Sequence, residues 1–259
     1  MATYLDRIID AHRAQAAVDH RPLTDLVDRA RALAPTRGFR AALAAVDGLG
    51  VIAEVKRRSP SKGPLAPDLD PAALARDYAD GGATALSVLT DVDWFGGSPE
   101  DLAAARAAVS LPVLRKDFTV SEHDVADARL MGADCVLLIV AALDQAELAG
   151  FHDLATDLGL DVLVEIHDEA ELERALAVGA TLIGVNQRDL VTFEVDTDRA
   201  VRMAPLMPQG VVRVAESGVR GPDDAARLAA AGYHAVLVGE SLVTAGDPRG
   251  GVAALRAAG

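Results

Sequence analysis

From residue 51 onward, short runs rich in β-branched residues and leucine alternate with alanine-rich stretches in which apolar residues recur every three or four positions. The short runs are typical of buried strands in a parallel sheet, and the longer stretches are typical of amphipathic helices. The eight expected strands cover residues 51–56, 84–89, 112–116, 134–139, 161–166, 181–186, 211–216 and 234–239. This alternation predicts repeated βα units.

Glycine marks the passage from several helical stretches into the next strand. Gly82, Gly132, Gly179 and Gly232 each follow a helical pattern and precede an apolar run. Glycine at that place fits the left-handed residue that often ends a helix. Eight such units with right-handed connections favour closure into a (β/α) TIM barrel. An open doubly wound sheet of the Rossmann or flavodoxin kind is the alternative, but its edge strands should be less apolar.

Residues 1–50 contain no expected strand. Two helical patterns cover about residues 3–18 and 23–33, and Pro22, Pro35 and Gly38 interrupt the segment. The segment is either a cap under the barrel or a lid that contributes to a site, and the pattern does not separate the two. Because TIM barrels of about 250 residues commonly form one unit, we expect a single domain over residues 1–259, with a helical extension (1–50) and a barrel (51–259).

Composition and charge narrow the class of protein. No apolar run approaches the roughly 20 residues that a membrane-spanning helix needs, and the N-terminus lacks the features of a signal peptide. We therefore expect a cytoplasmic protein without membrane contact. The net charge of -14 argues against binding to nucleic acid but not against a local cationic pocket for a small anion. The single cysteine, Cys135, lies in an apolar run and is expected to be buried.

Charged and polar residues stand where the expected strands end, which is where parallel barrels carry their active sites. Glu54 and Lys56 lie two positions apart and so share one face of the first strand. The ends of the third, fifth, sixth and seventh strands add Lys116, Glu165, Asn186 and Glu216. Each alone has a structural explanation, such as pairing with a neighbouring charge. Together around one mouth they predict a site.

The chain also carries a candidate phosphate site. No P-loop and no G-x-G-x-x-G follows a strand, so a nucleotide cradle is not expected. Ser217-Gly218 follows the seventh strand and Gly239-Glu240-Ser241 the eighth, where barrel enzymes commonly bind phosphate through backbone N–H groups. Ser59 and Lys62 in the first loop would complete the site. Because Glu240 is acidic, we expect its side chain to face away from the anion.

The six histidines do not show the spacing of a metal site, so no metal ion is expected. His167 is the histidine nearest to the end of an expected strand. We expect it to act as a structural hydrogen-bonding residue.

Over about residues 51–245 the sequence resembles the indole-3-glycerol-phosphate synthase family. The stretches that carry the resemblance are IAEVK (52–56), SPSKG (59–63), LT (89–90), FGGS (95–98), PVLRKDF (112–118), LVEIH (163–167), GVN (184–186), RDL (188–190) and ESG (216–218). The first stretches and PVLRKDF, in this order and spacing, are highly specific for the family.

The resemblance implies a barrel with an N-terminal extension and an enzyme of tryptophan biosynthesis that uses no metal and no organic cofactor. The implied reaction is that of a carboxy-lyase, which converts 1-(2-carboxyphenylamino)-1-deoxyribulose 5-phosphate to indole-3-glycerol phosphate, carbon dioxide and water. The implied partner is this small phosphorylated substrate. Since the chain ends soon after the last expected strand, a fused phosphoribosylanthranilate isomerase domain is not expected.

The resemblance also implies roles for individual residues. Lys116 would be the general acid for ring closure, Glu165 and Glu54 would transfer protons, Lys56 would hold or protonate the substrate, and Asn186 would orient reacting hydroxyls. The implied substrate contacts are Phe95, Phe118 and Leu190 for the aromatic ring, Arg188 and Glu216 for other parts of the substrate, and Ser59, Ser217, Gly218, Gly239 and Glu240 for the phosphate.

Two rival functions remain open. Phosphoribosylanthranilate isomerase is another phosphate-binding barrel enzyme, but the EVK and KDF stretches fit the synthase better. A barrel that has lost its activity and serves as a scaffold would lack an acid or a base. Glu54, Lys56, Lys116 and Glu165 are all present, and a lysine among charged neighbours suits proton donation.

Overall fold

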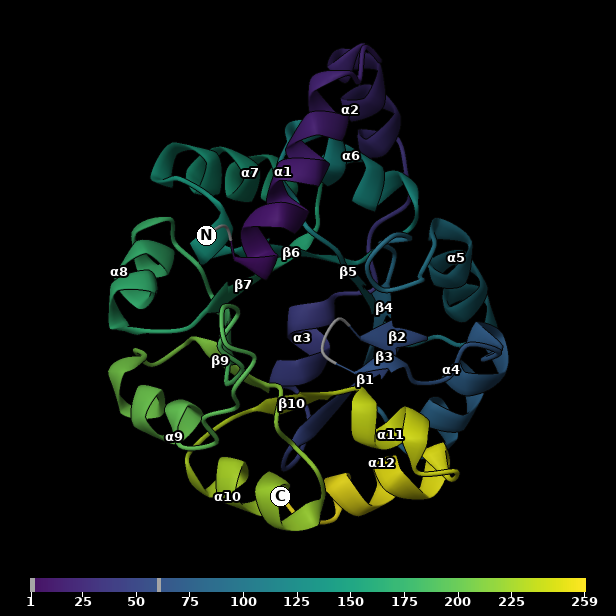
Figure 1. Ribbon diagram of the computed structural model, residues 1–259, viewed down its shortest axis with the longest axis vertical. Helices are drawn as coiled ribbons and strands as arrows, with labels where there is room; N and C mark the ends of the chain where they lie inside the picture. Colours follow the sequence, from purple (N-terminus) through teal and green to yellow (C-terminus); the bar gives the residue numbers. More distant parts are fainter. Residues whose placement is uncertain (1–2, 60–61) are drawn as a thin grey trace.

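Eight parallel strands close into a barrel surrounded by helices (Figure 1). The computed structural model describes residues 3–59 and 62–259, so Pro60 and Ser61 of the SPSKG stretch lie outside the described residues. The barrel strands follow one another in chain order, and the last pairs with the first: β1 (Gly50–Val55), β4 (Ala85–Leu89), β5 (Val113–Lys116), β6 (Cys135–Ile139), β7 (Asp161–Ile166), β8 (Leu182–Asn186), β9 (Val212–Glu216) and β10 (Ala235–Val238). The expected barrel is confirmed, and the open sheet is excluded.

Helices and 3₁₀ turns connect the strands along the outside of the barrel. They are α4 (Pro71–Asp80), α5 (Pro99–Ala108), α6 (Glu122–Leu130), η1 (Val140–Ala142), α7 (Gln145–Asp157), α8 (Glu169–Ala177), α9 (Arg199–Met203), η2 (Ala204–Leu206), α10 (Pro222–Ala230), α11 (Glu240–Thr244) and α12 (Pro248–Arg256). Side chains such as Ser98, Ser121 and Asp144 cap helix starts by accepting a backbone N–H. The expected glycines end the helices, since Gly82, with φ of 88°, is left-handed.

Alternation along each strand divides the apolar residues between two cores. Val51, Ala53 and Val55 of β1 face the surrounding helices, while Ile52 faces the barrel interior. The interior core also contains Cys135, whose side chain is buried as expected. Because direction alternates with every residue, the last inward-facing positions of each strand open into the carboxyl-terminal mouth.

The N-terminal extension reaches both ends of the barrel. Helices α1 (Tyr4–Ala17) and α2 (Leu23–Arg31) match the expected helical patterns, and α3 (Phe39–Ala44) is an additional helix. Phe39 and Leu43 of α3 are fully buried in the interior core, and the backbone N–H of Arg40 donates to Asp161 at the start of β7. Helix α3 therefore plugs the amino-terminal end, while α1 lies at the mouth (Figure 1).

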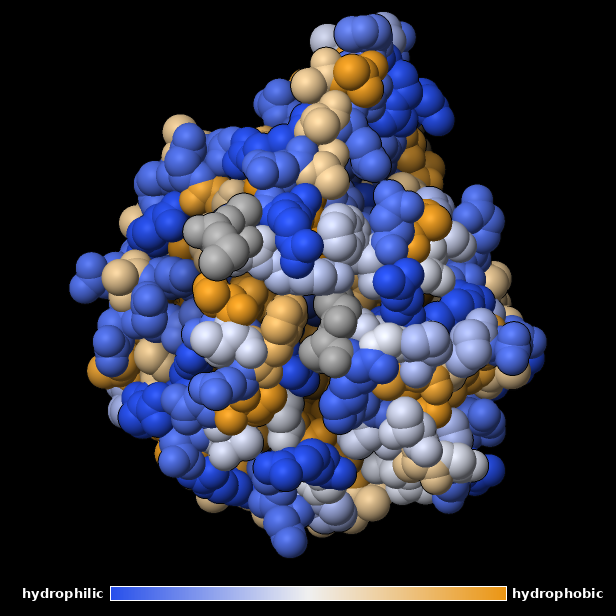
Figure 2. Space-filling view, viewed as in Figure 1, coloured by the Kyte–Doolittle hydropathy of each residue, from blue (hydrophilic) through white to orange (hydrophobic). Residues whose placement is uncertain are grey.

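A short hairpin follows the first barrel strand. It consists of β2 (Arg58–Ser59) and β3 (Gly63–Pro64), which pair antiparallel. Among the described residues, no helix is long and apolar enough to cross a membrane. The face that contains the mouth is largely hydrophilic, with hydrophobic side chains scattered among the polar ones (Figure 2).

Candidate active site

A cavity of about 610 Å³ opens at the carboxyl-terminal mouth of the barrel. Every residue that the sequence placed in the site lines this cavity: Glu54, Lys56, Ser59, Phe95, Lys116, Phe118, Glu165, Asn186, Arg188, Leu190, Glu216, Ser217, Gly218, Gly239 and Glu240. The apolar side chains of Leu137, Ile139 and Leu237 also contribute to its lining. Residues from every barrel strand or from the loops that follow thus meet at one place.

Strand alternation explains why charged side chains point into this cavity. Glu54, Lys116, Glu165 and Glu216 each stand two positions after an inward-facing apolar residue of the same strand. A period of two then directs each of these side chains to the inside of the barrel at its mouth. Glu165 and Glu216 are almost completely buried, with 1% and 2% of their surfaces exposed.

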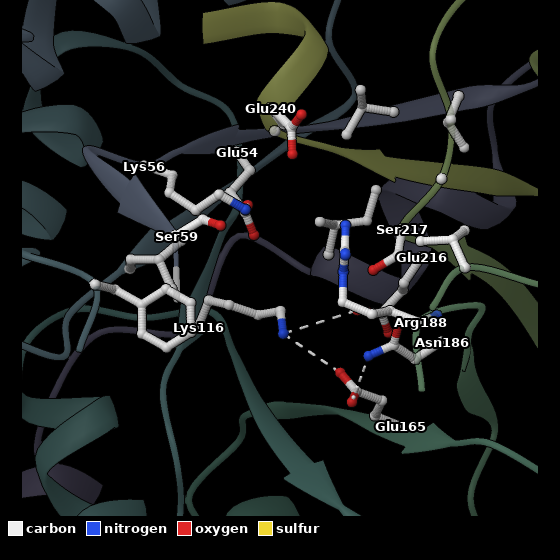
Figure 3. A pocket seen from close by; sticks show the side chains of 18 of the residues that line it. Glu54, Lys56, Ser59, Lys116, Glu165, Asn186, Arg188, Glu216, Ser217 and Glu240 are labelled. Carbon is white, nitrogen blue, oxygen red and sulfur yellow. Dashed lines mark hydrogen bonds and ion pairs between the residues drawn. The ribbon is translucent and has the colours of Figure 1, made fainter. Parts of the chain in front are cut away.

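Lys116 lies between two of the buried acids (Figure 3). Its Nζ is 3.3 Å from Oε2 of Glu165 and 3.9 Å from Oε2 of Glu216. Burial acts to lower the pKa of Lys116, but the negative charges of Glu165, Glu216 and Glu54 outweigh it and raise that pKa above its ordinary value. Lys116 is therefore an ammonium ion at neutral pH.

The two acids beside Lys116 differ in the direction in which their pKa values are shifted. Burial raises the pKa of Glu216 well above its ordinary value, and the negative charge of Glu165 raises it further. Burial also acts to raise the pKa of Glu165, but the charges of Lys116 and His167 and a hydrogen bond from Asn186 lower it overall. The pKa values of the two acids are therefore shifted in opposite directions, downward for Glu165 and upward for Glu216. Paired acids with opposite shifts are typical of acid–base sites.

Asn186 holds Glu165 in place. Its Nδ2 donates to Oε1 of Glu165 over 2.9 Å, and its Oδ1 accepts the backbone N–H of Arg188 over 3.0 Å. The side chain of Arg188 donates to the backbone carbonyl of Phe193 over 3.1 Å. In the described part of the chain no ion pair to a carboxylate forms at Arg188, which leaves its charge available in the cavity.

A second ion pair, between Glu54 and Lys56, lies at the end of β1. Their Oε1 and Nζ atoms are 2.6 Å apart, which confirms that the two side chains share a face of the strand. Gly239 packs directly against Glu54. A Cβ atom at position 239 would overlap the carboxylate of Glu54, so glycine is required there by close approach.

The wall formed by the loops after β4 and β5 carries aromatic rings. The ring centroids of Phe95 and Phe118 are 6.1 Å apart. Together with Leu190, these side chains present an apolar surface beside the charged residues. The cavity thus combines a surface for an aromatic ring with groups that can donate and accept protons.

The expected phosphate-binding segments lie on another side of the same cavity. Ser217 and Gly218 both have left-handed backbones, with φ of 65° and 76°. For Ser217 this conformation is uncommon, and such backbones often occur at functional sites. The prediction that the Glu240 side chain faces away was wrong, because its carboxylate lines the cavity and binds Nζ of Lys62.

Two histidines contact the site from outside the cavity. Nδ1 of His167 hydrogen-bonds Glu171 over 3.0 Å, as expected of a structural histidine, and its Nε2 lies 3.7 Å from Oε1 of Glu165. His12 of α1, which the sequence did not single out, reaches Asp91 and Asp117 at the mouth. The spacing of these three side chains would also allow them to hold a metal ion. The absence of a metal requirement remains a prediction.

Comparison with known proteins agrees with this geometry. The sequence profile of the family described as indole-3-glycerol phosphate synthase matches residues 5–255. A protein of that name from Nocardioides sp. is 55% identical over 96% of both chains, and one from Mycolicibacterium smegmatis is 54% identical over 100% of this chain and 95% of its own. Thiamine phosphate pyrophosphorylase from Pyrococcus furiosus has a similar fold, with a TM-score of 0.62 over 81% of this chain and 95% of its own, at 18% identity. On its sequence, the chain belongs to the indole-3-glycerol phosphate synthase family.

Proposed function

We propose that the cavity at the mouth converts 1-(2-carboxyphenylamino)-1-deoxyribulose 5-phosphate to indole-3-glycerol phosphate, carbon dioxide and water. The observation that carries the proposal is the placement of the Lys116 ammonium beside two buried acids whose pKa values are shifted in opposite directions. Ring closure needs a proton donor at the carbonyl oxygen and a base nearby. Both stand next to an aromatic wall that suits the anthranilate ring.

Lys116 is the general acid of the first step. The aromatic carbon that carries the carboxylate bonds to the carbonyl carbon, and the Lys116 ammonium donates a proton to the carbonyl oxygen as negative charge develops there. The carboxylates around Lys116 keep the donor protonated before the reaction. They also hold its Nζ in one place, as proton transfer within hydrogen-bond reach of the substrate requires.

Glu165 is the base of the later steps. Loss of carbon dioxide breaks the bond to the carboxyl carbon and restores the aromatic ring. The new hydroxyl group then leaves as water, which requires one proton at its oxygen and removal of another from the ring precursor. Glu165 accepts the latter because it is ionised and is oriented by Asn186. Lys56 and Glu216, whose pKa is raised by burial, are the further donors within the cavity.

The two anionic groups of the substrate bind at different cations and backbone groups. Arg188 suits the carboxylate, because its guanidinium has no carboxylate partner among the described residues of the cavity. The phosphate suits the turn at Ser217 and Gly218, the backbone at Gly239, and Ser59 and Lys62 of the first loop. Glycine allows a close approach of the anion to the backbone N–H groups.

A direct assay tests this function. The purified chain is incubated with the substrate in the presence of EDTA, and the fluorescence of the indole product is followed while released carbon dioxide is measured. We expect one carbon dioxide per indole-3-glycerol phosphate and full activity without added metal. Folded protein that forms no product, or whose activity disappears with EDTA, would contradict the proposal.

A further inference from the structure

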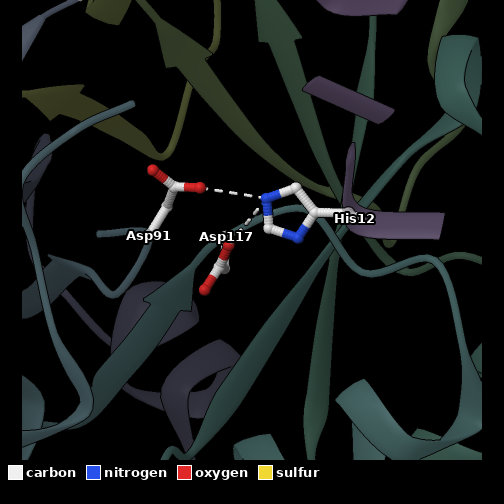
Figure 4. Close-up of side chains that lie close together, drawn as sticks. All are labelled: His12, Asp91 and Asp117. Atoms are coloured by element: carbon white, nitrogen blue, oxygen red, sulfur yellow. Dashed lines mark hydrogen bonds and ion pairs between the residues drawn. The ribbon is translucent and has the colours of Figure 1, made fainter. Parts of the chain in front are cut away.

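His12 ties the N-terminal helix α1 to two loops at the mouth of the barrel (Figure 4). Its Nε2 is 2.9 Å from Oδ2 of Asp91, which follows β4, and 4.0 Å from Oδ1 of Asp117, which follows β5. All three side chains are shielded, with 14%, 4% and 5% of their side-chain surfaces exposed. Of these three residues, only His12 belongs to the N-terminal extension. It bridges two loops that follow different strands of the barrel.

Each carboxylate that His12 contacts also holds the backbone of an aromatic residue of the cavity. Oδ1 of Asp91 accepts the backbone N–H groups of Trp94 and Phe95 over 2.6 and 3.0 Å. Oδ1 of Asp117 accepts the N–H of Phe118 over 2.8 Å. A displacement of either carboxylate would therefore move the backbone that carries Phe95 or Phe118.

His12 also contacts the aromatic wall directly. Its ring centroid lies 5.4 Å from that of Phe118, and Phe118 in turn contacts Phe95. Both phenylalanines line the cavity, whereas His12 is not among its lining residues. His12 thus supports the wall from behind and does not reach the reacting atoms.

We propose that protonated His12 is a positioning residue that holds Phe95 and Phe118 in the arrangement that receives the aromatic ring of the substrate. This inference rests on the proposed function. It assigns to α1 a role in substrate affinity, exerted through the two loops. The substrate would otherwise have to order these loops when it binds, and such an ordering cost weakens binding.

The charges around His12 explain why its protonation matters. The ligand atoms of Asp91, Asp117 and His12 all lie within 4.8 Å of one another, so the two carboxylates repel each other unless a cation stands between them. Arg115 of β5 already pairs with Asp117 over 2.9 Å, and Asp124 of α6 adds a further negative charge. When it is protonated, His12 places a cation beside Asp91 and joins that loop to the loop of Asp117.

The direction of the pH dependence follows from these contacts. Burial acts to lower the pKa of His12, but the hydrogen bond to Asp91 and the charges of Asp117, Asp91 and Asp124 raise it overall. The ion pair of His12 with the two carboxylates is therefore fully formed below the ordinary histidine pKa of about 6.5. It is lost as the pH rises through the raised pKa of His12. The substrate should therefore bind most tightly on the acidic side of this transition.

Steady-state kinetics of His12→Gln test the proposal, with Arg13→Gln as the matched control. Glutamine keeps an uncharged N–H donor near Asp91 but lacks the ring and the charge. Arg13 is the neighbouring anchor of α1, and it binds Glu147 of α7, away from both aromatic loops. We expect His12→Gln to raise KM about five- to tenfold, the scale of a lost aromatic contact with its ordering effect, and to leave kcat nearly unchanged. Arg13→Gln should change KM far less.

A fluorescence titration of the ligand-free protein provides a readout that does not require catalysis. Trp94 is the only tryptophan, and its ring lies 5.2 Å from that of Tyr4 on α1. We expect Trp94 emission to change with a midpoint above about pH 6.5 in the unmodified protein, and this transition should be absent in His12→Gln. If the transition occurs but no variant forms product, the proposed function fails while the coupling of His12 to the loop survives.

Three results would overturn the proposal. Equal increases of KM in His12→Gln and Arg13→Gln would show that only the docking of α1 matters. A loss confined to kcat would show that His12 does not act through binding. An activity that requires an added divalent cation, and loses this requirement in His12→Gln, would identify the three side chains as a metal site instead of an ion-paired support.

Discussion

Gly184 of β8 provides the space that the carboxyl group of Glu216 occupies inside the barrel, because a Cβ atom at position 184 would overlap Oε1 of Glu216. Gly239 has the same relationship to Glu54. Two glycines thus allow two acids to be buried at the mouth, where Glu54 pairs with Lys56 and Glu216 lies beside Lys116. The site depends on backbone positions without side chains as well as on its charged groups.

Replacing Gly239 by alanine tests the first consequence of this arrangement. The added methyl group would displace Glu54 and so disturb its ion pair with Lys56. We expect kcat to fall at least about tenfold, since small displacements of reacting groups have effects of up to about 10²-fold. Gly150→Ala is the control, because Gly150 lies within helix α7 with open space at its Cβ. Unchanged kinetics in Gly239→Ala would show that Glu54 has no part in the reaction.

Glu216→Gln should stabilise the fold while reducing activity. The pKa of Glu216 is raised in the folded state, so the folded state gains least from this group at high pH. The contribution of Glu216 to the free energy of unfolding is fully present below its pKa in the unfolded chain, about 4.3. This contribution is lost as the pH rises through its pKa in the folded protein. Glutamine removes this loss, and we expect the variant to melt about 2–4 °C higher at pH 8, as about 1 kcal/mol would produce.

The melting comparison is repeated at pH 5 to separate ionisation from packing. At pH 5 the difference in melting temperature between Glu216→Gln and the unmodified protein should be smaller, because Glu216 is then more fully protonated. A difference that is equal at both pH values would mean that packing explains it. A lower melting temperature of the variant at pH 8 would contradict the raised pKa of Glu216.

The pair between Lys62 and Glu240 predicts opposite effects of two variants on phosphate binding. Glu240→Gln frees Lys62 for the substrate phosphate, so we expect KM to fall. Lys62→Ala removes a cation and should raise KM, in each case by about two- to fivefold, as expected for a solvent-exposed charge pair worth under about 1 kcal/mol. Both shifts should diminish at high salt. If KM changed in the same direction in both variants, the pair of Lys62 and Glu240 would not belong to the phosphate site.

The sequence predicted the barrel closely because each strand is marked by a short apolar run within its own segment of the chain. All eight strands begin and end within one residue of the expected positions, since continuous β-branched runs are needed wherever a strand is buried on both faces. The convergence of Lys116, Glu165 and Glu216 followed from strand direction alone. Helix α3 was missed because it spans only Phe39–Ala44, too short for a periodic pattern to stand out.

The parts of the site that the sequence did not reveal depend on contacts between distant residues. His12 lies 79 positions from Asp91, and nothing in α1 indicates which loop it meets. Lys62 and Glu240 are 178 positions apart, so their pairing could not be expected from either loop by itself. The opposite pKa shifts of Glu165 and Glu216 likewise arise from burial depth and from the position of one shared lysine.

The most direct test of the account is the single-turnover rate of ring closure in Lys116→Met, measured together with the substrate dissociation constant. Methionine keeps the bulk of the stem but carries no proton, so the rate should fall at least ~10²-fold while affinity changes far less. Lys116→Arg should restore little activity, because a guanidinium holds its proton more tightly and has a different shape. Near-normal ring closure in Lys116→Met would contradict the account and leave Lys56 as the candidate acid.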